Sequence, residues 1–276
     1  MCNFFSRYII FTFWEPKEKI PGYIKLCIKT WKKYLPEYQI IILDFNKAKS
    51  FLGENLFSNI ICNKMSLMLQ SDAIRVAILN KFGGIWIDAD TIILNDKIIK
   101  YFQKHELSMI WEESVKLHYI SFIYASKYST IINEWKNTII IKVKKYKEIL
   151  LNKDNSNQWQ EEWKKVNLWN YLGNSIIEPL LKNITANQFF HKNSDTIKVC
   201  PELIYMKNSS LDNLQKYETF YFSKGETKFV LNNADSLIFL HNNWTPLKYK
   251  LMTEKEFLKQ DILLSKLLKQ LLELKE

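Results

Sequence analysis

The chain has few cysteines, and their spacing excludes the common cysteine-based sites. Four occur in 276 residues, far apart and without a C-x-x-C pair: Cys2, Cys27, Cys62 and Cys200. This spacing argues against a zinc site and gives no disulfide framework. We therefore expect a protein of a reducing, cytoplasmic compartment.

Long hydrophobic runs are also missing. The apolar run near the N-terminus covers only residues 8–14 and ends at Glu15 and Pro16. It is far too short to span a bilayer, and it lacks the small-residue cleavage site of a signal peptide. A first core strand is the better interpretation.

Acidic residues are fewer than basic ones: 29 Asp and Glu stand against 39 Lys and Arg, a formal charge of +10. Such an excess of basic residues suggests an anionic partner. The candidates are a nucleotide-linked substrate, a phospholipid surface and nucleic acid. The lysines are scattered, so charge alone does not choose among these. An apolar content of 47% is enough for a substantial core. Without repeats or low-complexity linkers, we expect a single domain over residues 1–276.

The apolar pattern predicts an α/β protein. Strands at residues 8–14 and 38–43 flank a helix that begins at Pro21 and ends before Pro36. This strand–helix–strand unit predicts a parallel sheet with right-handed crossovers. The other expected elements are helices at 63–82, 131–150, 167–181 (interrupted at Gly173) and 254–276, strands at 84–87, 107–111, 197–200 and 236–241, a loop or short helix at 46–60, and a loop at 152–165.

Glycine is scarce, yet two of the six glycines are adjacent, at Gly83 and Gly84. They end a helix and open the next strand, so they indicate a backbone requirement. Asp88 and Asp90 close that strand, and residues 91–94 continue the apolar pattern. Two carboxylates this close repel each other, and burial raises the cost unless a cation neutralises them. A hard divalent ion that carries a phosphate group would do so.

An acid and a base precede the glycines. Asp72 and Arg75 lie three residues apart on the expected helix, so they project from one face. Their plainest interpretation is a surface ion pair worth at most about 0.5 kcal/mol. Together with the glycines and the carboxylate pair, however, they form a longer motif, S-D-x-x-R and then G-G-I-W-x-D-x-D.

This motif resembles the hallmark of glycosyltransferases with the nucleotide-sugar-binding GT-A fold. It is similar to that of family-32 sugar transferases and bacterial capsular polysaccharide synthesis proteins, and the glucosylating clostridial toxins share its spacing. The resemblance covers residues 8–95 and again 236–250, where I-F-L-H-N-N-W is similar to a closing H-x-x-x-W segment. It implies an α/β fold with a mixed, mainly parallel central sheet flanked by helices. Residues 8–95 would then bind the nucleotide sugar, and 96–235 would form the acceptor side.

The resemblance also implies roles for the carboxylates and the ion pair. Asp90 would bind Mn²⁺ or Mg²⁺, which bridges the diphosphate of the nucleotide sugar. Asp88 would contact the ribose or the sugar and help to hold the metal through water. Asp72 and Arg75 would grip hydroxyls of the donor sugar.

Aromatic residues and the C-terminal segment complete the implied site. Trp86 would shape the donor pocket, while Phe13 and Trp14 would lie near the base and ribose. His241 would complete the metal coordination, with Asn243 as the alternative third ligand, and Trp244 would close over the diphosphate.

The expected function is the metal-dependent transfer of a hexose or N-acetylhexosamine from a UDP-linked nucleotide sugar. The anomeric configuration of the sugar would be retained. The acceptor would be a glycan or lipid-linked glycan in the synthesis of capsule, lipooligosaccharide or another surface polysaccharide. We expect no nucleic-acid partner. The amphipathic helix at 254–276, with Lys259, Lys266, Lys269 and Lys275, either packs on the domain or contacts the inner membrane peripherally on its cytoplasmic face.

Other interpretations of the same residues stay open at this point. A haloacid-dehalogenase-type phosphatase would use Asp88 as nucleophile, but its D-x-D usually closes the first strand. A toxin-like transferase would modify a protein, and a binding-only protein would have lost turnover, which nothing in the sequence supports. Trp111, Glu112 and Glu113 would face the acceptor or, as we prefer, form a solvated strand end.

Overall fold

The computed structural model describes residues 9–112, 116–151, 164, 168, 170–182, 189–193 and 198–274. Its contacts divide the chain into two compact units, each built from several segments. The first comprises residues 1–15, 41–87 and 102–191, and the second comprises 16–40, 88–101 and 192–276. The prediction of one domain with a donor part and an acceptor part stays a prediction.

Within the described residues, the first unit contains the larger sheet and five helices. Its strands are β1 (Ile9–Phe13), β2 (Gln39–Leu43), β3 (Gly84–Ile87), β5 (Leu107–Glu112), β6 (Leu117–Ala125) and β7 (Phe189–Asn193), and its helices are α2 (Phe45–Leu52), α3 (Glu54–Ile60), α4 (Leu67–Phe82), α6 (Thr130–Leu151) and α8 (Asn174–Leu181).

The six strands of this sheet follow the order β2-β1-β3-β6-β5-β7. β1 pairs with β3 in parallel, while β6 pairs with β3 and β5 in antiparallel fashion. The predicted α/β class with a mixed sheet is confirmed. β6 is an addition to the sequence interpretation, which contains no strand at residues 117–125.

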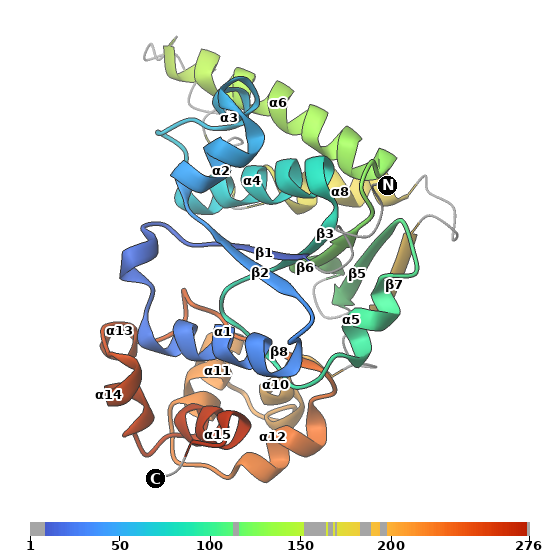
Figure 1. Cartoon of the computed structure of the whole chain (residues 1–276). Helices are drawn as coiled ribbons and strands as arrows, with labels where there is room; N and C mark the ends of the chain where they lie inside the picture. Colours follow the sequence, from blue (N-terminus) through green and yellow to red (C-terminus); the bar gives the residue numbers. More distant parts are fainter. Residues whose placement is uncertain are drawn as a thin grey trace. The chain divides into compact units, whose positions relative to one another are not determined.

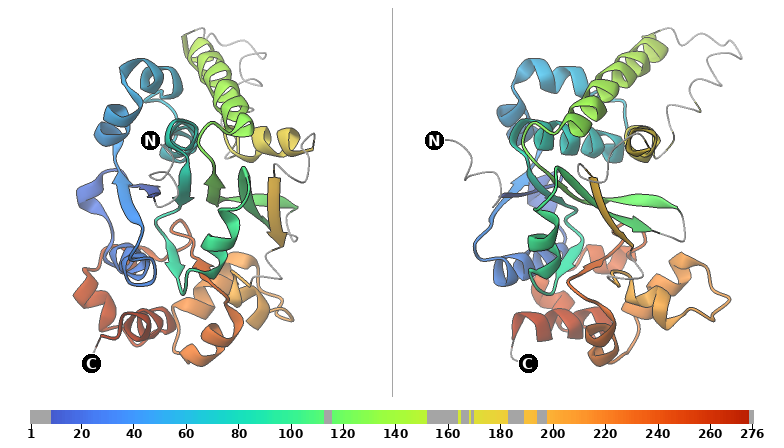
Figure 2. Two further views of the ribbon diagram at one scale, coloured as in Figure 1. Left: turned by 45° about the vertical axis from the view of Figure 1, so that its right-hand side comes forward. Right: turned by 90° about the vertical axis from the view of Figure 1, so that its right-hand side faces the viewer.

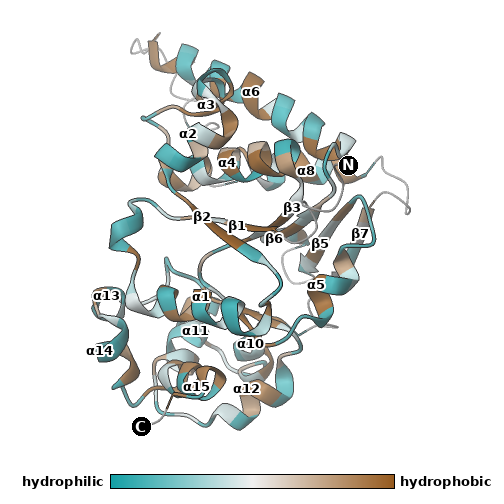
Figure 3. Cartoon of the chain, viewed as in Figure 1, coloured by the Kyte–Doolittle hydropathy of each residue, from teal (hydrophilic) through white to brown (hydrophobic). Residues whose placement is uncertain are grey.

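Helices α4, α6 and α8 lie together over one face of the sheet (Figures 1 and 2). α4 is the innermost, because ten of its residues are buried. Figure 3 shows apolar and polar residues alternating along α6, as expected for a helix with one covered face. The buried side of α6 includes Trp135, whose indole N–H donates to the carbonyl of Leu172 at 2.8 Å.

The glycine pair meets a backbone requirement, as predicted. Gly83 and Gly84 have φ of +68° and +99°, where a side chain is strained. A Cβ at Gly83 would also lie 2.5 Å from the backbone nitrogen of Lys127. The turn between α4 and β3 therefore depends on glycine for both conformation and space.

Comparing alanine substitutions at Gly83 and Gly53 separates the effect of backbone strain from that of the close contact with Lys127. Gly53 has a similar conformation, with φ 85° and ψ 154° against 68° and −165° for Gly83, but nothing lies within 4 Å of a Cβ added to it. Gly53→Ala should lower the free energy of unfolding by about 1–3 kcal/mol through strain alone. Gly83→Ala should cost about 1–3 kcal/mol more through overpacking. Urea denaturation measures both, and equal losses would contradict the close contact.

The second unit contains a two-stranded sheet and mostly short helices. Its elements are the 3-10 helix η2 (Lys17–Lys19), the helices α1 (Gly22–Tyr34), α5 (Lys97–Phe102), α10 (Pro201–Tyr205), α11 (Asn213–Tyr221), α12 (Thr227–Asn233), α13 (Leu247–Lys250), α14 (Glu254–Leu258) and α15 (Leu263–Leu272), and the strands β4 (Thr91–Ile93) and β8 (Leu237–Phe239).

The apolar residues after the D-x-D motif form a separate strand. β4 pairs with β8 in antiparallel fashion, with Thr91 opposite Phe239, and belongs to a different sheet from β3. Helix α1 holds β4 on its other side, since the Trp31 indole N–H donates to the carbonyl of Thr91 at 2.7 Å. The apolar pattern that continues through residues 91–94 therefore belongs to a second sheet and not to the sheet of β3.

The prediction of a single helix over residues 254–276 is wrong. Ile262 is extended between α14 and α15, and the N–H of Leu263 donates to the carbonyl of Ser223 at 2.8 Å instead of to its own helix. The apolar side of α15 is buried, with Leu264 and Leu267 fully covered. Membrane contact stays a prediction, but these leucines are occupied within the unit.

Three smaller predictions also differ from the structure. Residues 198–200 form no strand, and α8 begins only at Asn174, after a turn. Glu112 is buried and accepts a hydrogen bond from the Tyr119 hydroxyl at 2.6 Å, so it is not a solvated strand end. Glu113 and most of the loop at 152–165 lie outside the described residues. Among the described helices, none has the length and apolar character needed to cross a membrane.

Candidate active site

In the first unit, Asp72 and Arg75 form a buried ion pair. Both project from α4, and Nη1 of Arg75 lies 2.8 Å from Oδ1 of Asp72. Each side chain is only 4% exposed, so the interpretation as a surface pair is wrong. Two buried charges at this distance depend strongly on each other, because either one alone would be costly to keep from water.

Trp86 lies against this pair. It belongs to β3, is 1% exposed, and its ring centroid is 5.2 Å from the guanidinium carbon of Arg75. Such a contact favours a cation over an aromatic face. The D-x-x-R and G-G-I-W parts of the motif are therefore joined in space, although ten residues separate Arg75 from Trp86 in the sequence.

The aromatic residues of β1 have different surroundings. Phe13 is buried against Phe45, with ring centroids 5.3 Å apart, and forms part of the core of the first unit. Trp14 is partly exposed, and its backbone N–H donates to the carbonyl of Leu43 at 2.9 Å. The predicted donor-binding role of both residues stays a prediction.

Gly173 is a close neighbour of Asp72 that the motif does not contain. A Cβ at this position would lie 3.2 Å from Oδ2 of Asp72 and 2.8 Å from Cδ1 of Ile120. In the sequence, Gly173 is noticeable only because it interrupts the helix expected at residues 167–181. The structure adds the reason, which is the close approach of the chain to the Asp72 carboxylate.

Gly173→Ala should therefore lower the free energy of unfolding by about 1–3 kcal/mol. The larger part of this loss should come from Ile120, whose Cδ1 is the nearest atom. Adding Ile120→Val, which removes that carbon, should restore part of the stability. Chemical denaturation of the two single variants and the double variant gives the coupling, and strictly additive losses would contradict the contact.

In the second unit, the chain after β8 holds Asp90. The N–H of Asn242 donates to Oδ2 of Asp90 at 2.8 Å, and the N–H of Leu240 donates to its backbone carbonyl at 3.1 Å. Asp88 opens the turn before β4, since its carbonyl accepts the N–H of Thr91 at 3.1 Å. The D-x-D motif and the H-N-N-W segment are thus neighbours, despite about 150 intervening residues.

Buried tyrosines support the same segment. The Tyr23 hydroxyl donates to Oδ1 of Asn242 at 2.6 Å, and the Tyr217 hydroxyl accepts the N–H of His241 at 3.1 Å. Burial, and then the Asp90 carboxylate, raise the pKa of Tyr23, so its hydroxyl stays a donor. Neither tyrosine belongs to the motif, so the sequence does not point to them. Each comes from a distant helix and hydrogen-bonds to a backbone or amide group beside Asp90.

His241 and Trp244 lie against each other, with ring centroids 4.1 Å apart. Burial lowers the pKa of His241 to about 4, so its imidazole is neutral near pH 7. A neutral imidazole is the form that coordinates metal ions. Asn243, the alternative third ligand, is exposed, and its role as a ligand stays a prediction.

The residues of the second unit fit a divalent cation in their donor chemistry. Asp88 and Asp90 offer carboxylate oxygens, and the Asn242 N–H fixes the orientation of Asp90. Mg²⁺ is typically bound by one or two carboxylates together with substrate phosphates and water. Within the described part of the chain, no group of three His, Cys, Asp or Glu residues is placed to hold a metal ion.

These features define an α/β protein with a D-x-D motif oriented by its own C-terminal segment. The chain belongs to the family of capsular polysaccharide synthesis proteins, whose model matches residues 3–241. This confirms the resemblance to that family. A comparison with curated proteins found no match.

Solved structures to which the chain is similar are named as glycosyltransferases. The ligand-free glycosyltransferase domain from the YGT toxin has 10% identity and a TM-score of 0.47, over 98% of this chain and 100% of that one. GlyE of Streptococcus pneumoniae TIGR4 has 11% identity and a TM-score of 0.45, over 92% of this chain and 62% of that one. PaToxG glycosyltransferase has 19% identity and a TM-score of 0.37, over 64% of this chain and 69% of that one. The chain thus spans less than two thirds of the GlyE chain.

Proposed function

We propose that this protein is a GT-A glycosyltransferase that transfers a hexose or N-acetylhexosamine from a nucleotide sugar, UDP-linked, to a glycan or lipid-linked glycan. The reaction depends on Mn²⁺ or Mg²⁺, proceeds with retention and belongs to the synthesis of a capsular or related surface polysaccharide. Membership of the capsular polysaccharide synthesis family supports this proposal, because polysaccharides are built by forming glycosidic bonds.

The observation that carries the proposal is the hydrogen bond from the Asn242 N–H to the Asp90 carboxylate. A metal ligand must be held in one orientation by its own partners. Here the donor is a backbone group of the segment that the motif predicts to close over the diphosphate, and Tyr23 in turn fixes the Asn242 side chain.

Each residue of the motif then has a proposed role. Asp90 binds the cation, and Asp88 assists it through water and contacts the ribose or sugar. His241 as a further ligand stays a prediction, because no three such residues within the described part of the chain are placed together to hold a metal ion. When bound, the cation stabilises the negative charge that develops on the leaving nucleoside diphosphate. Trp244 covers the diphosphate.

The other predicted residues make the proposed contacts to the sugar and the nucleoside. Asp72 and Arg75 hydrogen-bond to hydroxyls of the donor sugar, and Trp86 shapes the space beside Arg75. Phe13 and Trp14 lie near the base and ribose. The buried charges of Asp72 and Arg75 support this role, because a fixed ion pair is a pre-organised set of donors and acceptors.

A donor screen tests the proposal. The purified protein is incubated with UDP-glucose, UDP-galactose, UDP-N-acetylglucosamine, UDP-N-acetylgalactosamine and GDP-mannose, with Mn²⁺ and a panel of methyl glycosides as acceptors. We expect nucleoside diphosphate release from a UDP-sugar that stops on chelation, and a product with the anomeric configuration of the donor by NMR. Phosphate release from simple phosphomonoesters, without release from any nucleotide sugar, would instead support a phosphatase.

A further inference from the structure

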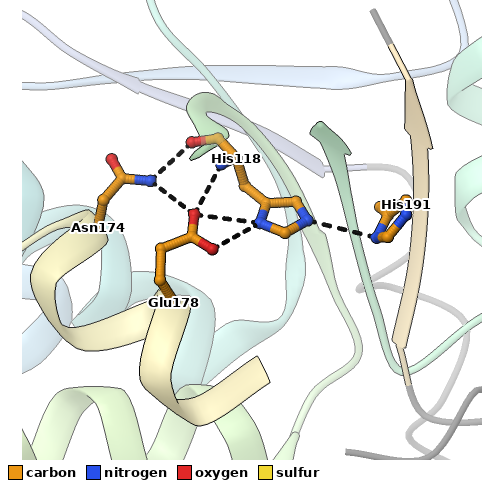
Figure 4. Close-up of polar contacts among 4 residues, drawn as sticks. All are labelled: His118, Asn174, Glu178 and His191. Carbon is orange, nitrogen blue, oxygen red and sulfur yellow. Dashed lines mark hydrogen bonds and ion pairs between the residues drawn. The ribbon is translucent and has the colours of Figure 1, made fainter. Parts of the chain in front are cut away.

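Three ionisable side chains of the first unit, Glu178, His118 and His191, form a line of contacts outside the D-x-D motif (Figure 4). Glu178 of α8 contacts Nδ1 of His118 with both oxygens, at 3.1 and 3.2 Å. Nε2 of His118 faces Nδ1 of His191, on β7, at 3.4 Å. The three groups therefore form a continuous line from a helix, through β6, to β7.

The hydrogen bonds around Glu178 keep it ionised. Its Oε1 accepts the backbone N–H of His118 at 2.7 Å and the amide of Asn174 at 3.1 Å, besides the contact with the ring. Burial raises the pKa of Glu178, but the hydrogen bonds from His118 outweigh it, and the pKa lies below its usual value. An ionised Glu178 fixes a proton on Nδ1 of His118, because a carboxylate only accepts.

This tautomer determines the protons further along the line. With Nδ1 of His118 protonated and its ring neutral, Nε2 is an acceptor, so Nδ1 of His191 must donate to it. The remaining nitrogen of His191, Nε2, then carries a lone pair. A proton taken up there can be shared with His118 by transfer across the 3.4 Å contact, where Glu178 stabilises the positive charge.

One end of the line is accessible to a substrate. The His118 side chain is 5% exposed and that of Glu178 is 19% exposed, whereas the His191 residue is exposed. Partial burial of its ring, and then the neighbouring His118, lower the pKa of His191, so its ring is available as a base near pH 7. Trp111 stacks beside His191, with ring centroids 6.1 Å apart, and offers a flat apolar surface next to the base.

The same short segment also contacts the proposed donor-sugar residues. Gly173 packs closely on the Asp72 carboxylate, and the next residue, Asn174, donates to the carbonyl of His118 at 2.8 Å and to Glu178. The ion pair of α4 and the histidine line are thus held by adjacent residues at the start of α8. This adjacency connects the line with the reaction rather than with a remote part of the unit.

We propose that Glu178, His118 and His191 form a proton relay whose exposed end, His191, binds a hydroxyl of the acceptor sugar and removes its proton during glycosyl transfer. The inference rests on the proposed function. The acceptor O–H bond breaks as its oxygen bonds to the anomeric carbon on the face that the nucleoside diphosphate leaves. The diphosphate departs with the electron pair of the old bond, so the anomeric configuration is retained. The proton goes to Nε2 of His191, and the Nδ1 proton of His191 passes to His118. His191 is the catalytic residue, while His118 and Glu178 position it.

The test compares transfer to methyl glycosides in the wild type, His191→Ala, His191→Gln and Glu178→Gln. His105→Gln is the matched control, since this histidine belongs to the first unit but not to the line. Both His191 variants should lose transfer by about 10²-fold or more in kcat. Glutamine preserves hydrogen bonding but takes no proton, so it should not rescue transfer. Added imidazole should restore part of the rate of His191→Ala and leave that of Glu178→Gln unchanged.

Nuclear magnetic resonance of ¹⁵N-labelled histidines gives a readout besides activity. His118 should carry its proton on Nδ1 in the wild type and lose this preference in Glu178→Gln. Transfer by the His191 variants at the wild-type rate would overturn the relay, because the proton would then leave on the diphosphate. An Nε2-protonated His118 in the wild type would overturn it as well. Failure of the wild type to release nucleoside diphosphate from any donor would contradict the proposed function itself, which is a distinct result.

Discussion

Replacing Asp90 with asparagine should reduce nucleoside diphosphate release by about 10³-fold or more. Loss of the cation removes several kcal/mol of charge stabilisation from the leaving diphosphate, and each 1.36 kcal/mol corresponds to a factor of ten in rate. Asparagine is the informative substitution because its amide oxygen can still accept the N–H of Asn242, which lies 2.8 Å from Asp90 in the structure. The segment after β8 should therefore keep its place while the charge is lost.

Two variants complete this experiment. Asp90→Ala removes both the charge and the hydrogen-bond acceptor, so it should be inactive and also less stable than Asp90→Asn. Asp96→Asn is the matched control: its carboxylate pairs with Lys100 in the same unit and does not belong to the motif, so activity should be unchanged. Undiminished release by Asp90→Asn, with the metal chelated or present, would refute the metal role.

The second large effect concerns the stability of the first unit. Removal of either partner of the Asp72–Arg75 pair should lower the free energy of unfolding by about 3–5 kcal/mol. Both side chains are only 4% exposed, so the remaining charge would stay buried and lose this 2.8 Å contact. Asp72→Asn and Arg75→Met are the single variants to compare by denaturant-induced unfolding.

The double variant Asp72→Asn/Arg75→Met distinguishes this explanation from simple loss of packing. Because both charges of the pair are removed together, it should be more stable than the sum of the two single losses predicts, with a coupling of several kcal/mol. It should nevertheless be inactive if the pair contacts the donor sugar. Additive losses would mean that each side chain stabilises the unit independently.

The sequence correctly predicts those helices and strands whose signals lie within the element itself. The strand–helix–strand start, the helix before the glycines and the strand at residues 84–87 are confirmed, because their apolar periodicity and their glycine and proline boundaries lie within each element. The glycine pair is explained by its positive φ values. The family assignment is likewise confirmed, since its motif is compact and specific.

The sequence interpretation is wrong or incomplete where a distant partner decides the structure. The apolar pattern of residues 91–94 does not show which sheet they join, and the pairing with β8, far along the chain, decides it. The C-terminal helix is periodic throughout, yet the bond from Leu263 to the carbonyl of Ser223 breaks it. The same holds for the histidine line, because three residues on a helix and two strands have no common spacing in the sequence.

The orientation of the carboxylate motif is visible only in the structure, for a similar reason. The resemblance pairs the D-x-D motif with the H-N-N-W segment, but it does not identify the backbone N–H of Asn242 as the group that holds Asp90. Nor does it point to Tyr23, which reaches Asn242 from α1. Hydrogen bonds made by backbone groups leave no trace in residue type, so such partners escape a motif-based interpretation.

Calorimetric titration of UDP into the protein isolates the proposed metal role, because it measures binding without an acceptor or turnover. We expect that UDP binds in the presence of Mn²⁺, that binding is lost with chelator, and that Asp90→Asn binds UDP no better with Mn²⁺ than without it. UDP binding of equal affinity with and without the metal, unchanged in Asp90→Asn, would refute the proposal that Asp90 holds a cation on the donor diphosphate.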